Sequence, residues 1–306
     1  MKLLSHLNYI DVVAKKGSIR KAAESLNITS TALNRRILAL EDELGSPLFE
    51  RLANGVRLNT AGELLIQHIR KSISDLSRVK SQISDLSGIR SGHVTIAAGA
   101  ELVGTFLPRR IANYRTEFPE VSFEVLRRAP EDAMKSLNDF EADFALIFGP
   151  VPPSEFHIIL SVDLQVMVAM NASHPLAKAD IVRFYDCANY PAILPASGSG
   201  LYDLLIAAQR QKGTRLQEAI ISESFELMAH YTNEEQAISF MLSFGDTSYS
   251  SSYRDLIFRP LHKADSLQGR LHIVQNKGRV LSVAASKFVE QLNQHLCKIL
   301  PDHVHQ

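Results

Sequence analysis

Apolar residues recur at helical spacing from the start of the chain. The pattern over positions 3–14 predicts a helix that stops at Gly17. Ser18 is a good N-cap for a second helix, which runs through Leu26. Thr29 is a good N-cap for a third helix. The first forty residues therefore predict three helices, of which the second and third are joined by a tight turn.

The third predicted helix has two different faces. Leu33, Ile37 and Leu40 lie at i, i+4 and i+7, so they face inward. The opposite face carries small polar and basic side chains, namely Ser30, Thr31, Asn34 and Arg35. A helix of this composition can enter a DNA major groove while its apolar face packs on a small core. The pattern predicts a sequence-specific DNA-binding protein.

Two extended runs follow the third helix. They are Leu48–Arg51 and Val56–Asn59, and Asn54-Gly55 lies between them. Asn-Gly is a strong signal for a type I′ hairpin, because both turn residues need positive φ. A hairpin at this place is the wing of a winged helix-turn-helix. The next four residues, Thr60–Glu63, form a predicted capping box that opens another helix.

That helix has a long, narrow apolar seam. Its residues are spaced by three or four positions, namely Leu65, Ile69, Ile73, Leu76, Val79, Ile83 and Leu86. A seam over about three heptads is typical of a coiled coil. We expect this helix to pair with its copy in a second chain; packing against its own chain is the alternative. Residues Ser87–Gly92 are predicted to be a hinge.

Beyond the hinge, strand and helix patterns alternate. A first series runs from His93 to Phe148 and includes one predicted helix over Val103–Phe118. A second series runs from Leu164 to Leu242. A last strand and helix are expected at Arg270–Gln275 and Ala284–Ile299. This alternation predicts an α/β fold with a mostly parallel sheet and right-handed crossovers.

Charge is distributed unevenly over a 306-residue chain of formal net charge zero. Residues 1–90 hold 14 Lys and Arg against 9 Asp and Glu, and the remainder holds 19 against 24. This bias fits a DNA-binding head on an acidic body, although ordinary charge variation is the alternative. Cys187 and Cys297 form no Cys-x-x-Cys, so neither a disulfide framework nor a zinc site is expected.

The N-terminus lacks a signal cleavage site, and no apolar run approaches the roughly 20 residues that span a bilayer. We therefore expect a cytoplasmic protein that binds neither membrane nor metal. Ser197-x-Ser199 has no Gly-x-Ser-x-Gly elbow, and the sequence contains no phosphate loop. We expect no enzyme and no cofactor. The alternative is a small-molecule-binding or enzymatic α/β protein with an incidental helix-turn-helix.

Short motifs occur in a fixed order along the chain. Those near the N-terminus are Ala22-Ala23-Glu24-x-Leu26, Ala32–Ile37, Leu40-Glu41-x-x-Leu44-Gly45, Leu48-Phe49-x-Arg51 and Leu58–Gly62. Those further on are Phe106-Leu107-Pro108, Phe118-Pro119-x-Val121, Ala142–Leu146 and His174–Ala177. Together they resemble LysR-type transcriptional regulators, and the resemblance covers essentially the whole chain.

The resemblance implies a winged helix-turn-helix, a dimerising linker helix with a hinge, and an effector-binding domain. The implied ranges are 1–60, 61–90 and 91–306. The last domain resembles periplasmic solute-binding proteins, with two α/β lobes and a ligand cleft between them. Lobe I is expected at about 91–162 and 267–306, and lobe II at about 163–266. Implied partners are double-stranded DNA with a dyad-symmetric operator, an unidentified small-molecule effector and a homodimer or homotetramer, with RNA polymerase as a further candidate.

The family match also indicates which side chains contact DNA. The candidates are Ser30, Thr31, Asn34, Arg35, Arg36, Arg51 and Arg57. Arg35 could pair bidentately with guanine and Asn34 with adenine, each worth about 1–3 kcal/mol of discrimination. Contact with phosphates alone is the alternative for Arg35, and the favoured one for Arg36. The two wing arginines could reach the DNA backbone or minor groove, or remain solvated. Family members more often carry Ser where Asn34 stands, which suggests an altered operator.

A second set of candidates belongs to the effector cleft. They are Gly99, Ala100, Glu101, Phe148, Ser197, Gly198 and Ser199. Family members often place Ser or Thr where Glu101 falls. Its charge would repel a carboxylate ligand unless Arg127 or Arg128 offsets it, so we hypothesise an effector that is neutral, cationic or rich in donors. A carboxylate that only favours the helix N-terminus is the alternative. For the Ser197–Ser199 loop, the alternative is a loop that only caps the next helix.

Overall fold

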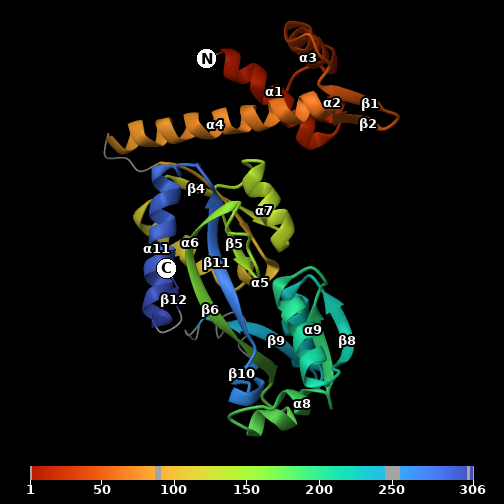
Figure 1. Ribbon diagram of the computed structural model, residues 1–306, viewed down its shortest axis with the longest axis vertical. Helices are drawn as coiled ribbons and strands as arrows, with labels where there is room; N and C mark the ends of the chain where they lie inside the picture. The colour runs from red at the N-terminus through yellow and green to blue at the C-terminus, as the bar shows by residue number, and fades with distance from the viewer. Residues whose placement is uncertain (1, 87–90, 245–255, 302–303, 306) are drawn as a thin grey trace. The chain divides into compact units, whose positions relative to one another are not determined.

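The structure is a computed structural model that describes residues 2–86, 91–244, 256–301 and 304–305. It contains two compact units, Met1–Lys80 and Ser81–Gln306. Figure 1 colours the chain from red at the N-terminus to blue at the C-terminus. Residues 87–90 of the predicted hinge lie outside the described residues. In the described parts of the chain, no helix has the length and hydropathy needed to cross a membrane.

The first unit consists of helices and one hairpin. Its elements are α1 (Lys2–Lys16), α2 (Ile19–Ser25), α3 (Ser30–Leu44), β1 (Phe49–Leu52), β2 (Gly55–Leu58) and the start of α4 (Thr60–Leu86). The two predicted N-caps are confirmed: the side chains of Ser18 and Thr29 accept hydrogen bonds from the backbone N–H groups of Lys21 and Ala32. The predicted inward residues of α3 are also confirmed, because Leu33 and Ile37 are buried in the core of this unit. This region is therefore a winged helix-turn-helix.

The hairpin forms as expected, but its turn differs from the prediction. Phe49 pairs with Leu58 and Leu52 with Gly55, so the turn residues are Ala53 and Asn54. Neither has positive φ, so the predicted type I′ turn at Asn54-Gly55 is wrong. Gly55 instead begins β2 with φ of 145°, and an added Cβ there would overlap the carbonyl oxygen of Gly17. The glycine is required by close approach of the wing to the turn between α1 and α2.

The cap of α4 lies one position earlier than predicted. Asn59 Oδ1 accepts a hydrogen bond from the Gly62 backbone N–H at 2.9 Å, so Asn59 caps the helix and Thr60 is its first residue. The Asn59 amide also donates to the Pro47 carbonyl at 2.7 Å. One side chain therefore caps the helix and fixes the chain that enters the wing.

The seam of α4 has two environments. Ile69 is fully buried in the core of the first unit, and Leu65 and Ile73 pack against that core. Further along, Val79 is 40% exposed and Ile83 is 60% exposed. The side chain of Leu86 lies outside the described residues. Packing against its own chain therefore accounts for the first part of the seam, whereas the second part presents apolar side chains to solvent.

The second unit begins with an α/β lobe, here called the first lobe. Its strands are β3 (Gly92–Ala98), β4 (Val121–Arg127) and β5 (Phe144–Phe148), and its helices are α5 (Ala100–Val103), α6 (Leu107–Glu117), α7 (Pro130–Asn138) and α11 (Val283–Ile299). The single helix predicted over Val103–Phe118 is divided into α5 and α6. Gly104 ends α5, and Pro108 lies in the first turn of α6, where its missing N–H leaves no bond unmade.

Both faces of the first lobe's sheet are covered by helices. One face of β3 contributes Val94, Ile96 and Ala98 to the core beneath α6 and α11 (Figure 1). The other face contributes Ala97, which packs in a separate cluster with Ala133 of α7. Successive strand residues point to opposite faces, so burial on both sides requires the near-continuous apolar runs seen in this sequence.

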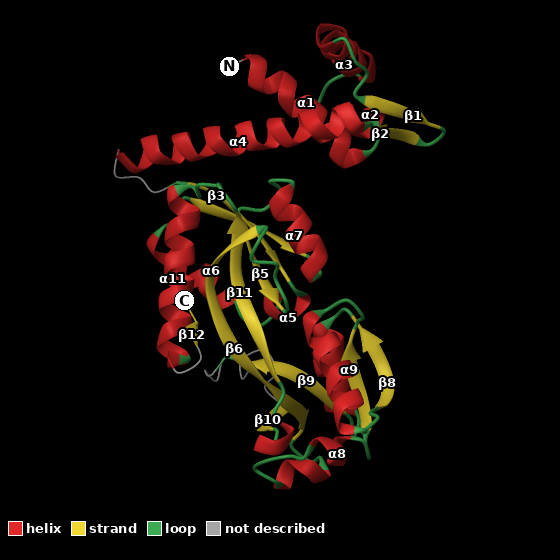
Figure 2. Cartoon of the chain, in the orientation of Figure 1, coloured by secondary structure: helices red, strands yellow, loops and turns green. Residues whose placement is uncertain are grey.

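The remaining strands form a second lobe and connect it to the first. They are β6 (Phe156–Asn171), β7 (Pro191–Pro195), β8 (Gln217–Ser222), β9 (Ile238–Ser243), β10 (Leu256–Pro260), β11 (Gln268–Asn276) and β12 (Val304–His305). The helices are α8 (Phe184–Cys187), α9 (Gly200–Lys212) and α10 (Phe225–Glu234), with 3-10 turns at Pro175–Lys178 and Lys263–Asp265. Figure 2 shows the long strands β6 and β11 running from one lobe into the other.

The sheet is mixed, so the prediction of a mostly parallel sheet is wrong. Its order is β4-β3-β5-β11-β6-β9-β7-β8, with β10 and β12 also paired to β6. Pairs within a β-α-β unit are parallel, namely β3 with β4 and β5, and β7 with β8 and β9. Pairs made by β6 and β11 are antiparallel. The chain leaves the first lobe through β6 and returns through β11, so these strands must run in opposite directions.

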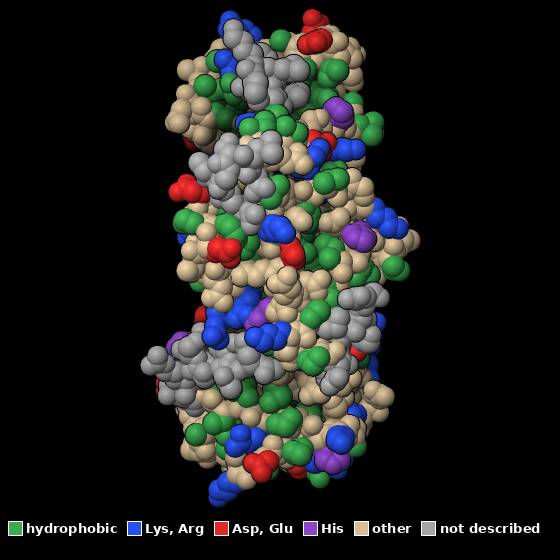
Figure 3. Space-filling view, turned by 90° about the vertical axis from the view of Figure 1, so that its left-hand side faces the viewer, with side chains coloured by type: hydrophobic (Ala, Val, Ile, Leu, Met, Phe, Trp, Pro, Cys, Tyr) green, Lys and Arg blue, Asp and Glu red, His purple; other side chains and the backbone are tan. Residues whose placement is uncertain are grey.

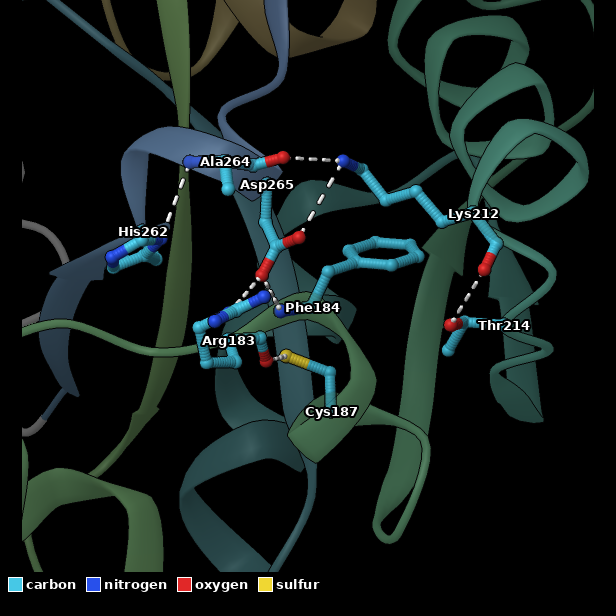
Figure 4. Close-up of polar contacts among 8 residues, drawn as sticks. All are labelled: Arg183, Phe184, Cys187, Lys212, Thr214, His262, Ala264 and Asp265. Carbon is cyan, nitrogen blue, oxygen red and sulfur yellow. Dashed lines mark hydrogen bonds and ion pairs between the residues drawn. The ribbon is translucent and has the colours of Figure 1, made fainter.

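A buried carboxylate fixes α8 in the second lobe. Asp265 accepts hydrogen bonds from Arg183 Nε at 2.5 Å and from the Phe184 backbone N–H at 3.2 Å, and Lys212 Nζ lies 3.6 Å away (Figure 4). Burial alone would raise its pKa, but these hydrogen bonds and cations hold the pKa below its ordinary value. Nearby Cys187 is buried and unbridged, and burial raises its pKa to about 12, so this thiol is unreactive.

Candidate functional site

The outer face of α3 presents polar and basic side chains. Ser30, Thr31, Arg35 and Arg36 are exposed, and Asn34 is half-buried. The fold places them there because the opposite face supplies Leu33 and Ile37 to the core. The exposed side chains of α3 are therefore free to donate hydrogen bonds to the acceptor groups of a ligand.

The wing arginines are held by neighbouring side chains. Arg51 Nη2 donates to Asn34 Oδ1 at 3.4 Å, which connects the wing to α3. Arg57 pairs with Glu50 directly across the hairpin at 2.6 Å, and both side chains are exposed. The guanidinium of Arg36 lies 4.7 Å from the centroid of the Tyr9 ring. Arg35 is the exposed arginine of α3 for which the described contacts give no such constraint.

A buried ion pair ties α1 to α4. Arg70 Nε lies 2.7 Å from Asp11 Oδ1, and Lys15 Nζ lies 2.9 Å from Asp11 Oδ2. Asp11 is only 6% exposed. The i, i+4 spacing of Asp11 and Lys15 could have revealed half of this cluster from the sequence. Arg70 comes from 59 positions away and carries no local signal.

A cavity of about 440 Å³ lies where the strands of the first lobe end, and the second lobe completes its wall. Six of the seven residues proposed for the effector cleft line it, namely Gly99, Ala100, Glu101, Ser197, Gly198 and Ser199. The parallel pairing of Ala98 with Arg127 brings the ends of β3 and β4 to the same edge. Ser199 Oγ also accepts a hydrogen bond from the Tyr202 backbone N–H at 3.2 Å, so this loop both caps α9 and forms cavity wall.

Phe148 does not join this group. It lines a second, neighbouring cavity of about 1130 Å³, together with Gly269 and His272. An added Cβ at Gly269 would overlap the Phe148 ring, and one at Gly200 would overlap the Phe148 carbonyl oxygen. Phe148 is 2% exposed, and its side chain is packed where β5 meets both β11 and α9. The spacing of the sequence could not reveal this, because the contacts come from distant segments.

His272 of the second cavity wall belongs to a polar pair that the sequence prediction missed. His272 Nδ1 and Ser161 Oγ lie 2.7 Å apart across β11 and β6, and both residues are buried. Burial, together with the nearby charge of Arg270, lowers the His272 pKa to about 4. The imidazole is therefore neutral at physiological pH and serves as a hydrogen-bonding group.

Glu101 is the most unusual residue of the first cavity. It is 2% exposed, and within the described parts of the chain its Oε2 has no hydrogen-bond partner. Burial raises its pKa to about 6, against a lowering contribution from a hydrogen bond with its own backbone N–H. The carboxylate lies directly over the Cα of Gly99, where an added Cβ would come within 2.5 Å of Oε1 and 2.6 Å of Oε2.

The arginines of the cavity are directed elsewhere. Arg127 Nη2 lies 3.2 Å from Glu223 Oε2, and Arg127 Nη1 donates to the Glu223 carbonyl. Arg128 Nη1 donates to the Arg127 carbonyl at 3.1 Å. Among the described residues, neither arginine forms an ion pair with Glu101. The Arg127–Glu223 contact instead joins the end of β4 to the segment after β8, and so bridges the two lobes beside the cavity.

One face of the molecule carries mixed charge. On the face drawn in Figure 3, Lys and Arg side chains lie among acidic and apolar ones. A group of three or more His, Cys, Asp or Glu residues able to hold a metal is absent from the parts of the chain that the structure describes.

Comparison with known proteins identifies both units. Residues 4–63 match the family of bacterial regulatory helix-turn-helix proteins, lysR family, and residues 87–297 match the LysR substrate binding domain. The regulator YbhD of Escherichia coli is 28% identical over 93% of this chain and 89% of its own length. The transcriptional activator CmpR of Synechocystis is 26% identical over 92% of each chain.

Solved structures show the same fold at low sequence identity. A full-length OxyR variant from Pseudomonas aeruginosa superposes with a TM-score of 0.73 at 18% identity, covering 99% of this chain and 98% of its own. Full-length CbnR complexed with its target DNA gives 0.65 at 18% identity, covering 95% and 99%. The two family matches together span most of the chain. This protein therefore belongs to the LysR family of DNA-binding transcriptional regulators, with an effector-binding domain that follows its winged helix-turn-helix.

Proposed function

We propose that the outer face of α3 reads the operator sequence of this regulator. The observation that carries the proposal is the exposure of Ser30, Thr31 and Arg35 on a helix whose other face is locked into a core. Arg35 is placed to pair with a guanine edge, and Asn34 with adenine once it leaves its weak contact to Arg51. Arg36, stacked on Tyr9, and the wing residues Arg51 and Arg57 would contact phosphates or the adjacent minor groove.

The effector is proposed to bind in the 440 Å³ cavity, within the size range of small-molecule sites. We take the lobes to be residues 91–162 with 267–306, and 163–266, preceded by the DNA-binding head at 1–60 and the linker at 61–90. The cavity wall draws on both lobes, so a ligand there could favour one lobe arrangement over another. Phe148 is proposed to influence the effector cavity indirectly, through its packing where β5 meets β11 and α9.

The regulator is proposed to work as a homodimer or homotetramer on a dyad-symmetric operator. Val79, 40% exposed on the second part of the α4 seam, supports pairing of this helix with a copy of itself. A two-fold dimer would present two recognition helices to two half-sites. Sedimentation of a strict monomer, with and without DNA, would contradict this part of the proposal.

The remaining expectations follow from the family. We infer that the chain regulates transcription without catalysing a reaction and needs no cofactor besides its effector. A regulator that binds bacterial DNA works in the cytoplasm, where RNA polymerase is a further candidate partner. The apolar seam of α4 is here assigned to protein pairing and not to a membrane.

Operator binding is the experiment that tests the DNA proposal. Genome-wide mapping of binding sites would supply the operator, and fluorescence anisotropy would then compare Arg35→Ala with Arg36→Ala on operator and scrambled DNA. Arg35→Ala should lose about 10-fold to 100-fold on the operator and relax its sequence preference. Arg36→Ala should weaken both DNAs similarly and reduce the salt dependence. Equal losses on both DNAs for Arg35→Ala would contradict base reading by this residue.

A further inference from the structure

The wall of the effector cavity contains a buried acid that the protein does not neutralise. Glu101 is 2% exposed, and its Oε2 accepts no hydrogen bond from the residues that the structure describes. A buried carboxylate oxygen without a partner is costly, so natural proteins rarely keep one unless an external group completes it. Glu101 lines a cavity that is open to small molecules. The missing partner can therefore come from a ligand.

The backbone is shaped to hold this carboxylate at the wall. Both carboxylate oxygens lie over the Cα of Gly99, in the space that a Cβ would occupy. Any other residue at this position would displace the Glu101 side chain. The absence of a Cβ at Gly99 therefore leaves the space that the Glu101 carboxylate occupies.

The charges around the cavity leave the acid uncompensated. Arg127 is paired with Glu223 and Arg128 donates to a backbone carbonyl. The wall otherwise adds the acids Asp132 and Glu223, so it carries three acidic and two basic side chains. A carboxylate ligand next to Glu101 would meet a buried like charge, whereas a cation would remove the cost of burying this one.

We propose that the effector carries a protonated amine and that its ammonium group binds the Glu101 carboxylate once this buried side chain turns toward the cavity that the residue lines. An ammonium supplies up to three N–H donors, of which one completes Oε2, and it brings the positive charge that the wall lacks. Ala129, Pro130, Pro195 and Phe225 supply apolar wall for the body of such a ligand. This assignment rests on the proposed function of the cavity and names the chemical class that it selects.

Four compounds with the same four-carbon chain test the assignment. Thermal melting and calorimetric titration at pH 7.5 would compare 1,4-diaminobutane and 4-aminobutanoate with 1,4-butanediol and succinate. The two amines should raise the Tm of the full chain at about 10 mM, because even millimolar binding to the native state gives a shift there. The diol and the diacid should give no shift.

Two variants distinguish Glu101 from charge in general. Glu101→Gln keeps the side-chain shape but removes the charge, and should weaken amine binding at least about tenfold. Glu120→Gln removes the same charge from an exposed loop and should leave amine binding within about twofold. Overturning results are equal binding of the diol or diacid, unchanged amine affinity in Glu101→Gln, or no shift with either amine.

Operator binding by the wild-type chain is measured separately. Loss of the amine response with operator binding intact would overturn the amine assignment alone. An amine response in a chain whose α3 variants do not alter operator recognition would overturn the DNA proposal alone. The two failures are therefore distinguishable.

Discussion

Two buried carboxylates, one in each unit, have opposite surroundings. Asp11 in the DNA-binding head is 6% exposed and is held by Arg70 at 2.7 Å and Lys15 at 2.9 Å. Glu101 in the effector domain is 2% exposed, and no described residue hydrogen-bonds to its Oε2. Both lie where a charge is costly, but only the first is compensated by its own chain.

The difference shows which buried acid is structural and which is available for binding. A paired acid such as Asp11 fixes helices, as Asp265 fixes α8 in the second lobe. Removing its partner should therefore damage the fold. An unpaired acid at a cavity lowers stability in the absence of a ligand, and its removal should stabilise the free protein. Substitutions at these two sites should therefore change the stability of the protein in opposite directions, which denaturation experiments can measure.

The largest effect is expected when the head loses its buried cation. Arg70→Ala should lower the free energy of unfolding by about 3 kcal/mol or more, because it leaves Asp11 with Lys15 alone. Chemical denaturation followed by circular dichroism would measure it. Arg20→Ala is the matched control, since the Arg20–Glu24 pair is exposed and spans 3.9 Å; its loss should cost less than about 0.5 kcal/mol. Similar costs for both variants would remove the distinction between buried and surface pairs.

A second large effect is expected at the wing. Gly55→Ala should cost about 2–3 kcal/mol, because the new methyl group would overlap the Gly17 carbonyl oxygen and residue 55 has positive φ. Asn54→Ala, at an exposed position without positive φ, should cost less than about 0.5 kcal/mol. Thermal unfolding of the two variants would measure both. A larger stability loss for Asn54→Ala than for Gly55→Ala would favour the predicted type I′ turn over the turn seen in the structure.

The smallest effect has the opposite sign and depends on pH. The folded protein holds the Glu101 proton more tightly than the unfolded chain, since burial raises the pKa from 4.5 to about 6. Wild-type stability should therefore fall as pH rises through this window. Glu101→Gln should be more stable than wild type by about 2 kcal/mol near pH 8, and equal to it below about pH 4.5.

Denaturation of wild type and Glu101→Gln across pH 4 to 8 measures that difference. A Glu101→Gln variant that is less stable than wild type at high pH would mean that the fold stabilises the charged carboxylate after all. The contrast with Asp11 would then disappear.

Local signals were sufficient where an element depends on its own neighbours. Ser18 and Thr29 cap their helices as predicted because an N-cap needs only the next turn of the chain. The same reasoning failed at Asn54-Gly55, where a distant carbonyl at Gly17 explains the glycine. It also failed for the direction of β6 and β11, because strand pairing depends on where the chain crosses between lobes.

The cavity was largely foreseeable and its chemistry was not. Residues that end strands or begin helices, such as Gly99 and Ser199, meet at one edge of an α/β sheet, so six candidates line one cavity. Whether the charge of Arg127 would offset that of Glu101 depended on Glu223, which pairs with Arg127 and lies 96 positions after it in the chain. Phe148 lines the neighbouring cavity, and distant residues, Gly200 and Gly269, determine its surroundings.

The sequence by itself determined the helices and the hairpin of the DNA-binding head, the inward and outward faces of α3 and the family to which the chain belongs. These properties depend on periodicity, caps and ordered motifs, all of which are local. Only the tertiary structure decided which charges have partners, because a carboxylate is neutralised by whichever residues the fold brings within about 4 Å. Asp11 has such partners, and Oε2 of Glu101 has none among the residues described by the structure. That difference, created by packing of distant segments, separates a structural acid from one that is open to a ligand.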